Sequence, residues 1–297
     1  MMKYVALLLS FGALIGISCK NQIAKPVAVS TNPNSLLWKI SKAGSDKVSF
    51  LYGTFHLLCK EDVLIGKPVD DAIVAADEVY FELDLDDPST MLSAMFFINM
   101  KNDTSITQLL TPDEMKRLSA FYRDTIGTPI TMFQRMKPAL LEAFMYPAML
   151  NCKNSSGVEQ ELLVKVSAAK KTVLGLETIQ DQTSVFDKIP YGVQAKSLLK
   201  SVDSFATSKE KFAEMVTNYK AQRLDLLSDA LDVDTEGLAG YLDELLYQRN
   251  RNWVEKLTTI LPSKKLFIAV GAGHLPGNQG LIDLLRKEGF TVEPMAN

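Results

Sequence analysis

Short apolar runs alternate with longer amphipathic stretches from residue 36 onward. Each run is bounded by turn-forming residues, which is the pattern of a buried strand. The predicted strands lie near residues 36–52, 79–85, 172–177, 266–270 and 290–294. Between them, apolar residues recur every three or four positions, which predicts helices. Strands separated by helices indicate an α/β protein with a mixed central sheet.

The first predicted strand region is a hairpin, and two later stretches are helical throughout. Ala43–Asp46 is a polar turn between the strand segments Leu36–Lys42 and Val48–Tyr52. Two insertions, at about residues 88–150 and 190–262, have helical patterns and no strand-like run. We therefore expect these insertions to form a helical lobe attached to the sheet.

The strongest local pattern lies near the C-terminus. The apolar run Leu266–Val270 is followed by the turn Gly271–Gly277, whose three glycines and one proline permit close approach of the backbone to a ligand. Asn278 is expected to cap the helix that follows. The final strand, Phe290–Pro294, is expected to lie beside Leu266–Val270.

Both histidines of the chain occur in the same local design, a strand followed by Gly-x-x-His. The two motifs are Gly53–His56 and Gly271–His274. The motif glycines are Gly53, Gly271, Gly273 and Gly277. One such histidine alone is more often a satisfied core or surface residue. Both histidines of this chain, however, occur in the same context. We therefore predict a sheet built from two related halves that share a function, each half a strand followed by Gly-x-x-His.

Two glutamates and an arginine complete the candidate chemistry. His56, Glu82 and His274 can form a two-His-one-carboxylate metal site, which suits zinc, iron, cobalt or manganese. Such a metal acidifies a bound water. Glu177 is placed to orient a ligand or act as general base, and Arg249 to pair with a carboxylate of the protein or the substrate. The alternative for each glutamate alone is an ordinary ion pair.

The N-terminal residues 1–19 resemble a bacterial lipoprotein signal peptide. Val5–Ile17 is apolar but short for a membrane span, and Cys19 is then the lipid-bearing first mature residue. Residues 20–35 are predicted to form a tether, which leaves 36–297 as a single domain. We expect a lipid-anchored protein of the cell envelope, on the periplasmic or outer-membrane side. An ordinary signal peptide and secretion are the alternative.

Net charge bears on the expected partners, and cysteine content bears on possible cross-links. A net charge of −3 provides no basic face, so no nucleic-acid partner is expected. Besides Cys19, only Cys59 and Cys152 remain. They can pair in an oxidising compartment, although the sequence does not place them close together. Cys59 can also be a third ligand near His56, but the favoured interpretation is a small buried hydrophobic residue.

Several motifs, taken in order, resemble the TraB/GumN family, which is related to the Tiki metalloproteases. The resemblance extends from about Leu36 to Val292. The matching segments are Leu51–His56, Ala76–Glu82, Leu174–Thr178 with Gln182 after it, Arg249–Asn250 and Val270–Gly277. Two positions depart from it: Glu159 stands where Asp is usual, and Ala139 where an aromatic residue is usual.

The resemblance implies a mixed-sheet α/β fold of two related halves and a metal site of His56, Glu82 and His274. It also implies a divalent metal of the manganese or cobalt type, with zinc as an alternative, and peptidase activity. Glu82, Glu177 and Arg249 are the expected catalytic residues. Two functions follow: a metal-dependent hydrolase that cleaves peptides, or a non-catalytic protein that captures a peptide or small ligand at the cell surface.

Overall fold

The computed structural model describes residues 34–227 and 237–296. The predicted signal peptide, Cys19 and nearly all of the predicted tether lie outside the described residues. The described chain forms a six-stranded mixed sheet, a small two-stranded sheet and surrounding helices. The predicted α/β class is therefore confirmed.

The strands of the central sheet lie in the order β6-β4-β7-β2-β1-β8. Their bounds are β1 Leu37–Ser41, β2 Ser49–Thr54, β4 Glu78–Phe81, β6 Thr172–Gly175, β7 Leu266–Gly271 and β8 Thr291–Met295. β6, β4, β7 and β2 run parallel, whereas β1 pairs antiparallel with β2 and with β8. The predicted hairpin is present as β1 and β2. The two strands that precede the histidine motifs, β2 and β7, are direct neighbours.

Parallel pairing brings the carboxyl ends of four strands to one edge of the sheet. Thr54 at the end of β2 lies opposite Gly271 at the end of β7. Phe81 at the end of β4 lies opposite Ala269 in β7 and opposite Gly175 at the end of β6. Open α/β sheets build their sites at this edge. The segments that leave it here carry both histidine motifs and two of the candidate glutamates.

The last strand lies at the far edge of the sheet, so its predicted position beside β7 was wrong. β7 pairs with β2 on one side and with β4 on the other. No edge of β7 is free, and β8 pairs along its whole length with β1 instead. The order of strands in the chain does not tell which edges are already occupied.

The helix before β8 begins later than predicted. α14 (Leu281–Lys287) has Gly280 at its N-cap, so the prediction of Asn278 as the cap was wrong. The turn before the helix folds back tightly: a Cβ at Gly280 would lie only 2.1 Å from the Pro276 carbonyl oxygen. Gly277 within this turn has a φ of +84°, which a residue without Cβ adopts without strain. The tight turn extends past Asn278 and delays the helix.

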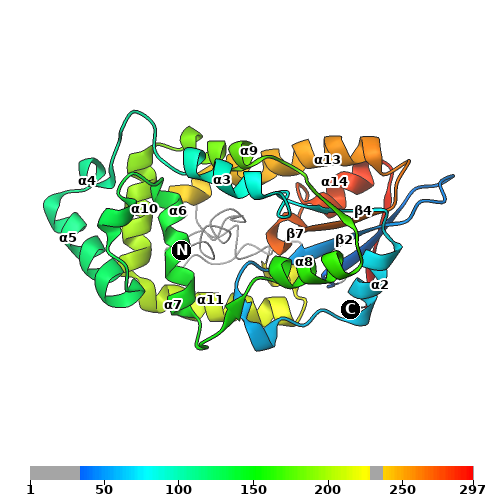
Figure 1. Cartoon of the computed structure of the whole chain (residues 1–297), viewed down its shortest axis with the longest axis horizontal. Coiled ribbons are helices and arrows are strands. Elements are labelled where there is room, and N and C mark those ends of the chain that lie inside the picture. Colours follow the sequence, from blue (N-terminus) through cyan, green and yellow to red (C-terminus); the bar gives the residue numbers. More distant parts are fainter. Residues whose placement is uncertain (1–33, 228–236, 297) are drawn as a thin grey trace, which may run out of the picture.

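Helices flank the sheet along two sides. Figure 1 shows α13 (Gln248–Ile260) and α14 along one side, and α2 (Lys67–Ala75) and α8 (Val158–Ala168) along the other. α2 begins with Pro68 in its first turn, as its sequence predicts, and buries Val69, Ala72 and Ile73. Such burial of one helix face against a sheet defines the layered architecture of α/β proteins.

Most helices of the two stretches predicted as insertions build the lobe on the left of Figure 1, but α13, at the end of the second stretch, lies along the sheet instead. The helices of the lobe, together with those that join it to the sheet, are α3 Pro88–Phe97, α4 Ile106–Leu109, α5 Pro112–Phe121, α6 Pro138–Leu141, α7 Tyr146–Met149, α9 Ile179–Ser184, α10 Tyr191–Asp203 and α11 Phe205–Lys220. α5 starts with the capping box of Thr111 and Glu114 and continues into a π-helical turn that ends at Gly127. Apolar residues of the lobe and sheet form one continuous core.

A disulfide joins Cys59 to Cys152. Next to it, β3 (Leu58–Cys59) and β5 (Ser155–Ser156) form the small two-stranded sheet. The interpretation of Cys59 as a free buried residue was therefore wrong. A disulfide sulfur is not a thiolate, which excludes Cys59 as a metal ligand while the bond is intact. The two cysteines are 93 positions apart, and only the fold brings them together.

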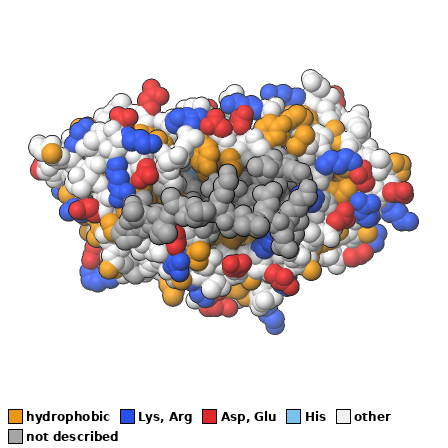
Figure 2. Space-filling model, turned by 180° about the vertical axis from the view of Figure 1, so that it is seen from behind, with side chains coloured by type: hydrophobic (Ala, Val, Ile, Leu, Met, Phe, Trp, Pro, Cys, Tyr) orange, Lys and Arg blue, Asp and Glu red, His pale blue; other side chains and the backbone are white. Residues whose placement is uncertain are grey.

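Charged side chains of both signs are interspersed over the face seen in Figure 2. Apolar side chains on this face form small groups among them. Within residues 34–227 and 237–296, no helix combines the length and the apolar character required to cross a membrane.

Candidate active site

The predicted site residues are brought together at the carboxyl edge of the sheet. His56 follows β2, Glu82 follows β4, Glu177 follows β6 and His274 follows β7. Each lies one to three residues beyond the last residue of its strand. Arg249, the fifth candidate, reaches the same place from the first turn of α13. Parallel strands thus gather side chains that are up to 218 positions apart in the chain.

Glu82 is the centre of this group. It is buried, with 5% of its surface exposed, and both of its carboxylate oxygens are engaged. Oε1 accepts a hydrogen bond from the Gly271 backbone N–H at 2.8 Å. Oε2 accepts from Arg249 Nη2 at 2.7 Å and from Gln182 Nε2 at 3.1 Å. The position of Glu82 is therefore fixed by the second histidine motif, by α13 and by α9 together.

Arg249 lies between two buried carboxylates. Its Nη2 contacts Glu82 Oε2 at 2.7 Å and Glu177 Oε1 at 2.6 Å, and its Nε also donates to Glu177. Trp253 Nε1 donates to the other oxygen of Glu177. Burial alone would lower the pKa of Arg249, but Glu177 and Glu82 raise it, so the guanidinium stays charged. Burial raises the pKa of Glu177, against the opposing effect of Arg249.

His274 is fully buried, and its ring orientation is fixed by α13. Nδ1 lies 2.6 Å from Asn250 Oδ1, while the Asn250 amide donates to the backbone carbonyls of His274 and Gln279. An amide oxygen only accepts, so Nδ1 of His274 carries the ring proton. Nε2 is left unprotonated: it accepts a hydrogen bond from Arg249 Nη1 at 3.4 Å and lies 3.8 Å from Glu82 Oε1. Burial, then Arg249, lowers the pKa of His274 well below its ordinary value, which keeps the ring neutral.

His56 has a different partner. Its Nδ1 lies 2.6 Å from Glu159 Oε1, in the first turn of α8, which is ion-pair distance but not hydrogen-bond geometry. Thr54 Oγ1 donates to the same Glu159 oxygen at 2.5 Å. Burial would lower the pKa of His56, but Glu159 raises it, and the net shift is upward. A carboxylate at Nδ1 draws the proton of the neutral ring to that nitrogen and leaves Nε2 bare. The two histidines therefore present the same nitrogen to the centre of the site.

The motif glycines permit the close approach of the two halves. A Cβ at Gly271 would lie 3.3 Å from both Glu82 Oε1 and His56 Nε2, which places these two atoms against the same glycine. A Cβ at Gly53 would lie 3.2 Å from Ala272 in the other motif. Gly273 belongs to the short 3₁₀ helix Ala272–His274, and Gly277 to the turn that follows. Each first glycine thus lets the opposite motif pack on its backbone.

The donor atoms suit a divalent metal in kind, but they are not arranged as a closed metal site. Among the described residues, no group of three or more His, Cys, Asp and Glu side chains has an arrangement that could hold a metal ion. Instead, one oxygen of Glu82 faces Arg249. His56 Nε2 and Glu82 Oε1 nevertheless both lie against Gly271, and His274 Nε2 lies 3.8 Å from Glu82 Oε1. Two imidazoles and one carboxylate are a donor set that fits manganese, cobalt or zinc. Gln182 Oε1, beside Glu82, is buried without a hydrogen-bond partner in the described structure.

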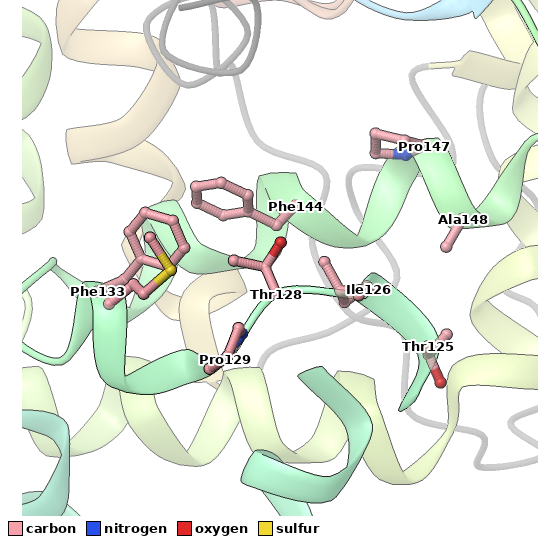
Figure 3. A pocket seen from close by; sticks show the side chains of 10 residues that line it. Thr125, Ile126, Thr128, Pro129, Phe133, Phe144, Pro147 and Ala148 are labelled. Carbon is pink, nitrogen blue, oxygen red and sulfur yellow. The ribbon is translucent and has the colours of Figure 1, made fainter. Parts of the chain in front are cut away.

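A pocket of about 480 Å³ lies elsewhere, in the helical lobe. Figure 3 shows Phe133, Phe144, Pro129 and Pro147 around it, with Thr128 and Ile126 between them. Its lining comes from residues 125–148 and includes none of the charged residues at the sheet edge. The pocket is therefore not the place where the candidate chemistry is assembled.

Glu159, like Trp253, is a residue at this site that the sequence alone did not single out for function. Glu159 stands out in the sequence only as a departure from the family pattern, yet it contacts His56 directly. Gln182 and Asn250 appear in the sequence only as parts of the resemblance, and the structure places them against Glu82 and His274. A carboxylate in the first turn of a helix after Gly157 is a visible signal, but its partner lies 103 positions earlier.

Comparison with known proteins establishes the family of the chain. The family model described as the TraB/PrgY/gumN family matches residues 36–294, and the chain belongs to this family. Metalloprotease TIKI1 of Danio rerio is 25% identical over 313 residues, which cover 88% of this chain and 63% of the relative. Metalloprotease TIKI2 of Danio rerio is 23% identical, with 92% and 63% covered. A metalloprotease TIKI homolog of Nematostella vectensis is 22% identical, with 88% and 67% covered.

The chain spans 63% of the length of the two Danio rerio relatives. No solved structure matches the chain. The comparisons therefore establish the family of the chain, and the reaction it can carry out depends on the residues of the site.

Proposed function

We propose that the protein is a metal-dependent hydrolase that cleaves peptides. The observation that carries the proposal is the convergence of two imidazoles on Glu82: each ring is held at Nδ1, and each turns Nε2 towards the site. This arrangement supports metal ligation because an oxygen atom next to Nδ1 orients metal-binding histidines in the same way. The relatives from Danio rerio and Nematostella vectensis are named as metalloproteases, which supports the same class.

In this proposal His56, Glu82 and His274 hold the metal, which is manganese or cobalt, with zinc as the alternative. A divalent ion bound there would act as a Lewis acid and lower the pKa of a bound water. His274 supports this role because burial and Arg249 keep its ring neutral, the form that binds a metal. The guanidinium of Arg249 offsets the charge of Glu82 and Glu177 and is buried against them.

Glu177 is proposed to act by holding Arg249 at the site. One of its oxygens accepts from Arg249 Nη2 and Nε, and the other accepts from Trp253 and also lies near Arg249 Nε. A carboxylate engaged in this way is suited to orienting its partner, which is one of the two roles expected of it from the sequence. Glu82 and Arg249 are then the side chains nearest to the reacting groups.

A peptide substrate is supported by the apolar surface next to the site. α3 starts six residues after Glu82 and packs on α9, which carries Gln182. Leu92, Met95 and Phe96 on α3 are each more than 60% exposed. Exposed apolar patches of this kind serve as binding surfaces in soluble proteins. An extended peptide is a ligand that can lie along such a surface and reach the sheet edge.

We also propose that the protein is exported and anchored to the cell envelope through lipid on Cys19. The apolar run that ends before Cys19 motivates this, and the Cys59–Cys152 disulfide supports an oxidising compartment. The test is Cys19→Ser, which should abolish labelling by a radioactive fatty acid and release the protein from membranes. Secretion without an anchor is the conclusion if the native protein takes up no label.

A second function, ligand capture without turnover, is favoured by one observation. Glu82 is committed to Arg249, and among the described residues no metal-holding group is preformed. In this alternative, Arg249 and its two glutamates form a rigid buried network beneath a peptide-binding surface. Retention of a bound peptide that is not cleaved, and that chelators do not affect, would support it.

The experiment measures metal content and peptide cleavage in protein without a His tag. His56→Ala, Glu82→Gln, His274→Ala and the His56/His274 double variant are compared with the native protein. Each single change should lower manganese or cobalt affinity by at least about 10- to 100-fold, judged from the effect of changes around metal ligands. The double variant should be no less active than the worst single variant, because residues that act as one unit are non-additive. Full metal occupancy in folded His274→Ala would contradict the shared site.

A further inference from the structure

Two chain segments far apart in sequence are tied together around His56. Residues 55–60 follow β2, and residues 152–159 lead into α8. Leu58 pairs with Ser156 and Cys59 with Ser155 in the small sheet, and the Lys60 N–H donates to the Asn154 carbonyl. The Cys59–Cys152 disulfide closes one end of this pair of segments. We call the two segments together the His56 clamp.

The other end of the clamp is closed by the backbone next to His56. The Val158 N–H donates to the Phe55 carbonyl at 3.0 Å. Gly157 packs so closely that a Cβ there would lie 2.6 Å from the His56 carbonyl oxygen. Any side chain at this position would push His56 away from α8. The absence of a Cβ at Gly157 is therefore what allows Glu159 to come within reach of the His56 ring.

Glu159 is the clamp residue whose side chain contacts the His56 ring. It is 8% exposed and sits in the first turn of α8, where the helix dipole favours a negative charge. Its Oε1 lies 2.6 Å from His56 Nδ1 and accepts a hydrogen bond from Thr54, which is itself buried at the end of β2. Three independent elements thus fix one carboxylate oxygen against one ring nitrogen: β2, the disulfide-linked segments and α8.

We infer that the His56 clamp is a positioning device, and that Glu159 is the residue in it that sets the ring of His56. The negative charge of Glu159, 2.6 Å from Nδ1, favours the ring proton on Nδ1, and Nε2 then lies with Glu82 Oε1 on the side where Gly271 leaves room for both atoms. The disulfide and the small sheet keep α8 at the distance this contact requires. This inference deepens the proposed function, because it assigns the residues that prepare one metal ligand.

The test compares Glu159→Gln with Glu161→Gln. Both glutamates lie in the first turn of α8, but Glu161 accepts from Ser156 and does not contact His56. Manganese and cobalt binding are measured by calorimetry, and melting temperature is measured for each variant. Glu159→Gln should weaken metal binding by about 10- to 100-fold, with Glu161→Gln within twofold of the native protein. Equal metal affinity in folded Glu159→Gln and the native protein would overturn the inference.

A second measurement needs no metal. Nitrogen-15 NMR of the metal-free protein at pH 8 reports which ring nitrogen of His56 carries the proton. The native protein should have the proton on Nδ1, and Glu159→Gln should have a mixture of both tautomers. The same tautomer population in both proteins would overturn the inference. If the native protein binds no metal, the proposed function fails, and this measurement alone decides whether the clamp sets the ring.

A milder variant covers the case in which Glu159→Gln does not fold. Thr54→Val keeps the shape of the buried side chain but removes the hydroxyl that donates to Glu159. It should weaken metal binding and shift part of the His56 population to the other tautomer. Unchanged binding together with an unchanged tautomer in Thr54→Val would count against the clamp.

Discussion

At the residue scale, two buried carboxylates of the site depend on one shared cation. The single guanidinium of Arg249 faces the carboxylates of Glu82 and Glu177, and all three side chains are less than 10% exposed. His274 adds no charge, because burial and Arg249 lower its pKa. Buried charges are tolerated when they are paired, and removal of one partner leaves the other desolvated. Arg249 is therefore as much a structural residue as a functional one.

Arg249→Met should destabilise the protein by about 3–5 kcal/mol, because two buried carboxylates lose their cation. Chemical denaturation followed by circular dichroism measures this loss. Added manganese should restore part of it, since a bound cation offsets the same carboxylates. The matched control is Arg251→Met, also on α13, which removes an exposed ion pair with Asp243 and hydrogen bonds to Gln248 and Gln279. It should cost about 1 kcal/mol. Equal stability of the two variants would contradict the inference that Glu82 and Glu177 depend on Arg249.

At the element scale, the helical lobe contains a buried ionisable contact of its own. Glu142, just after α6, is 5% exposed and accepts a hydrogen bond from Ser201 of α10 at 2.6 Å. The buried residues Tyr122 and Tyr146 lie near it. Burial raises the pKa of Glu142 to about 7, against the opposing effect of the Ser201 hydroxyl. The packing of α6 on α10 is therefore most favourable when this carboxyl is protonated.

The sign of the resulting pH dependence follows from the raised pKa. Between its ordinary value of 4.5 and about 7, Glu142 holds a proton in the folded protein but loses it in the unfolded chain. The free energy of unfolding therefore decreases as pH rises through this range. The contribution lost between pH 5 and pH 8 is about 2–3 kcal/mol. Glu142→Gln should make the decrease smaller by this amount.

Denaturation at pH 5 and pH 8 checks this prediction. The matched control is Glu210→Gln, at an exposed position of α11, which should leave the difference between the two pH values unchanged. Parallel stability curves for the native protein and Glu142→Gln would mean that Glu142 is ionised throughout. In that case, protonation of Glu142 would not explain the packing of α6 on α10.

At the scale of the whole molecule, one covalent link joins the start of the sheet to the end of the first helical insertion. The Cys59–Cys152 disulfide spans 93 positions and closes a loop that contains α2, β4 and the helices from α3 to α7. A cross-link over such a loop removes conformations from the unfolded chain, and longer loops lose more entropy. The link also anchors the His56 clamp, so stability and site geometry depend on the same bond.

Replacement of both cysteines by alanine should therefore lower stability by roughly 2–5 kcal/mol. Denaturant titration under non-reducing conditions measures the change. Reduction of the native protein should reproduce the loss, whereas a reductant should have no effect on the double variant. A double variant as stable as the native protein would mean that the unfolded chain is already compact in this region.

The fold class and the position of the candidate residues were open to prediction from local sequence patterns. Buried strands and amphipathic helices have distinct periodicities, so the alternation of strands and helices followed directly. The two Gly-x-x-His motifs after strands pointed to the carboxyl edge of the sheet, and β2 and β7 are parallel neighbours there. These features depend on interactions between residues close together in the chain, so the local sequence is sufficient to predict them.

The partners of those residues were decided only by the tertiary structure. The position of β8, the Cys59–Cys152 bond and the contact between Glu159 and His56 each join segments far apart in sequence. Which strand edge is already paired, or which helix start faces a ring nitrogen, depends on the packing of the entire domain. The sequence by itself singled out five candidates, which are His56, Glu82, Glu177, Arg249 and His274, but not their neighbours Glu159 and Trp253. Only the folded chain decided that Arg249 lies between two carboxylates and that each histidine is held at Nδ1 with its Nε2 turned to Glu82.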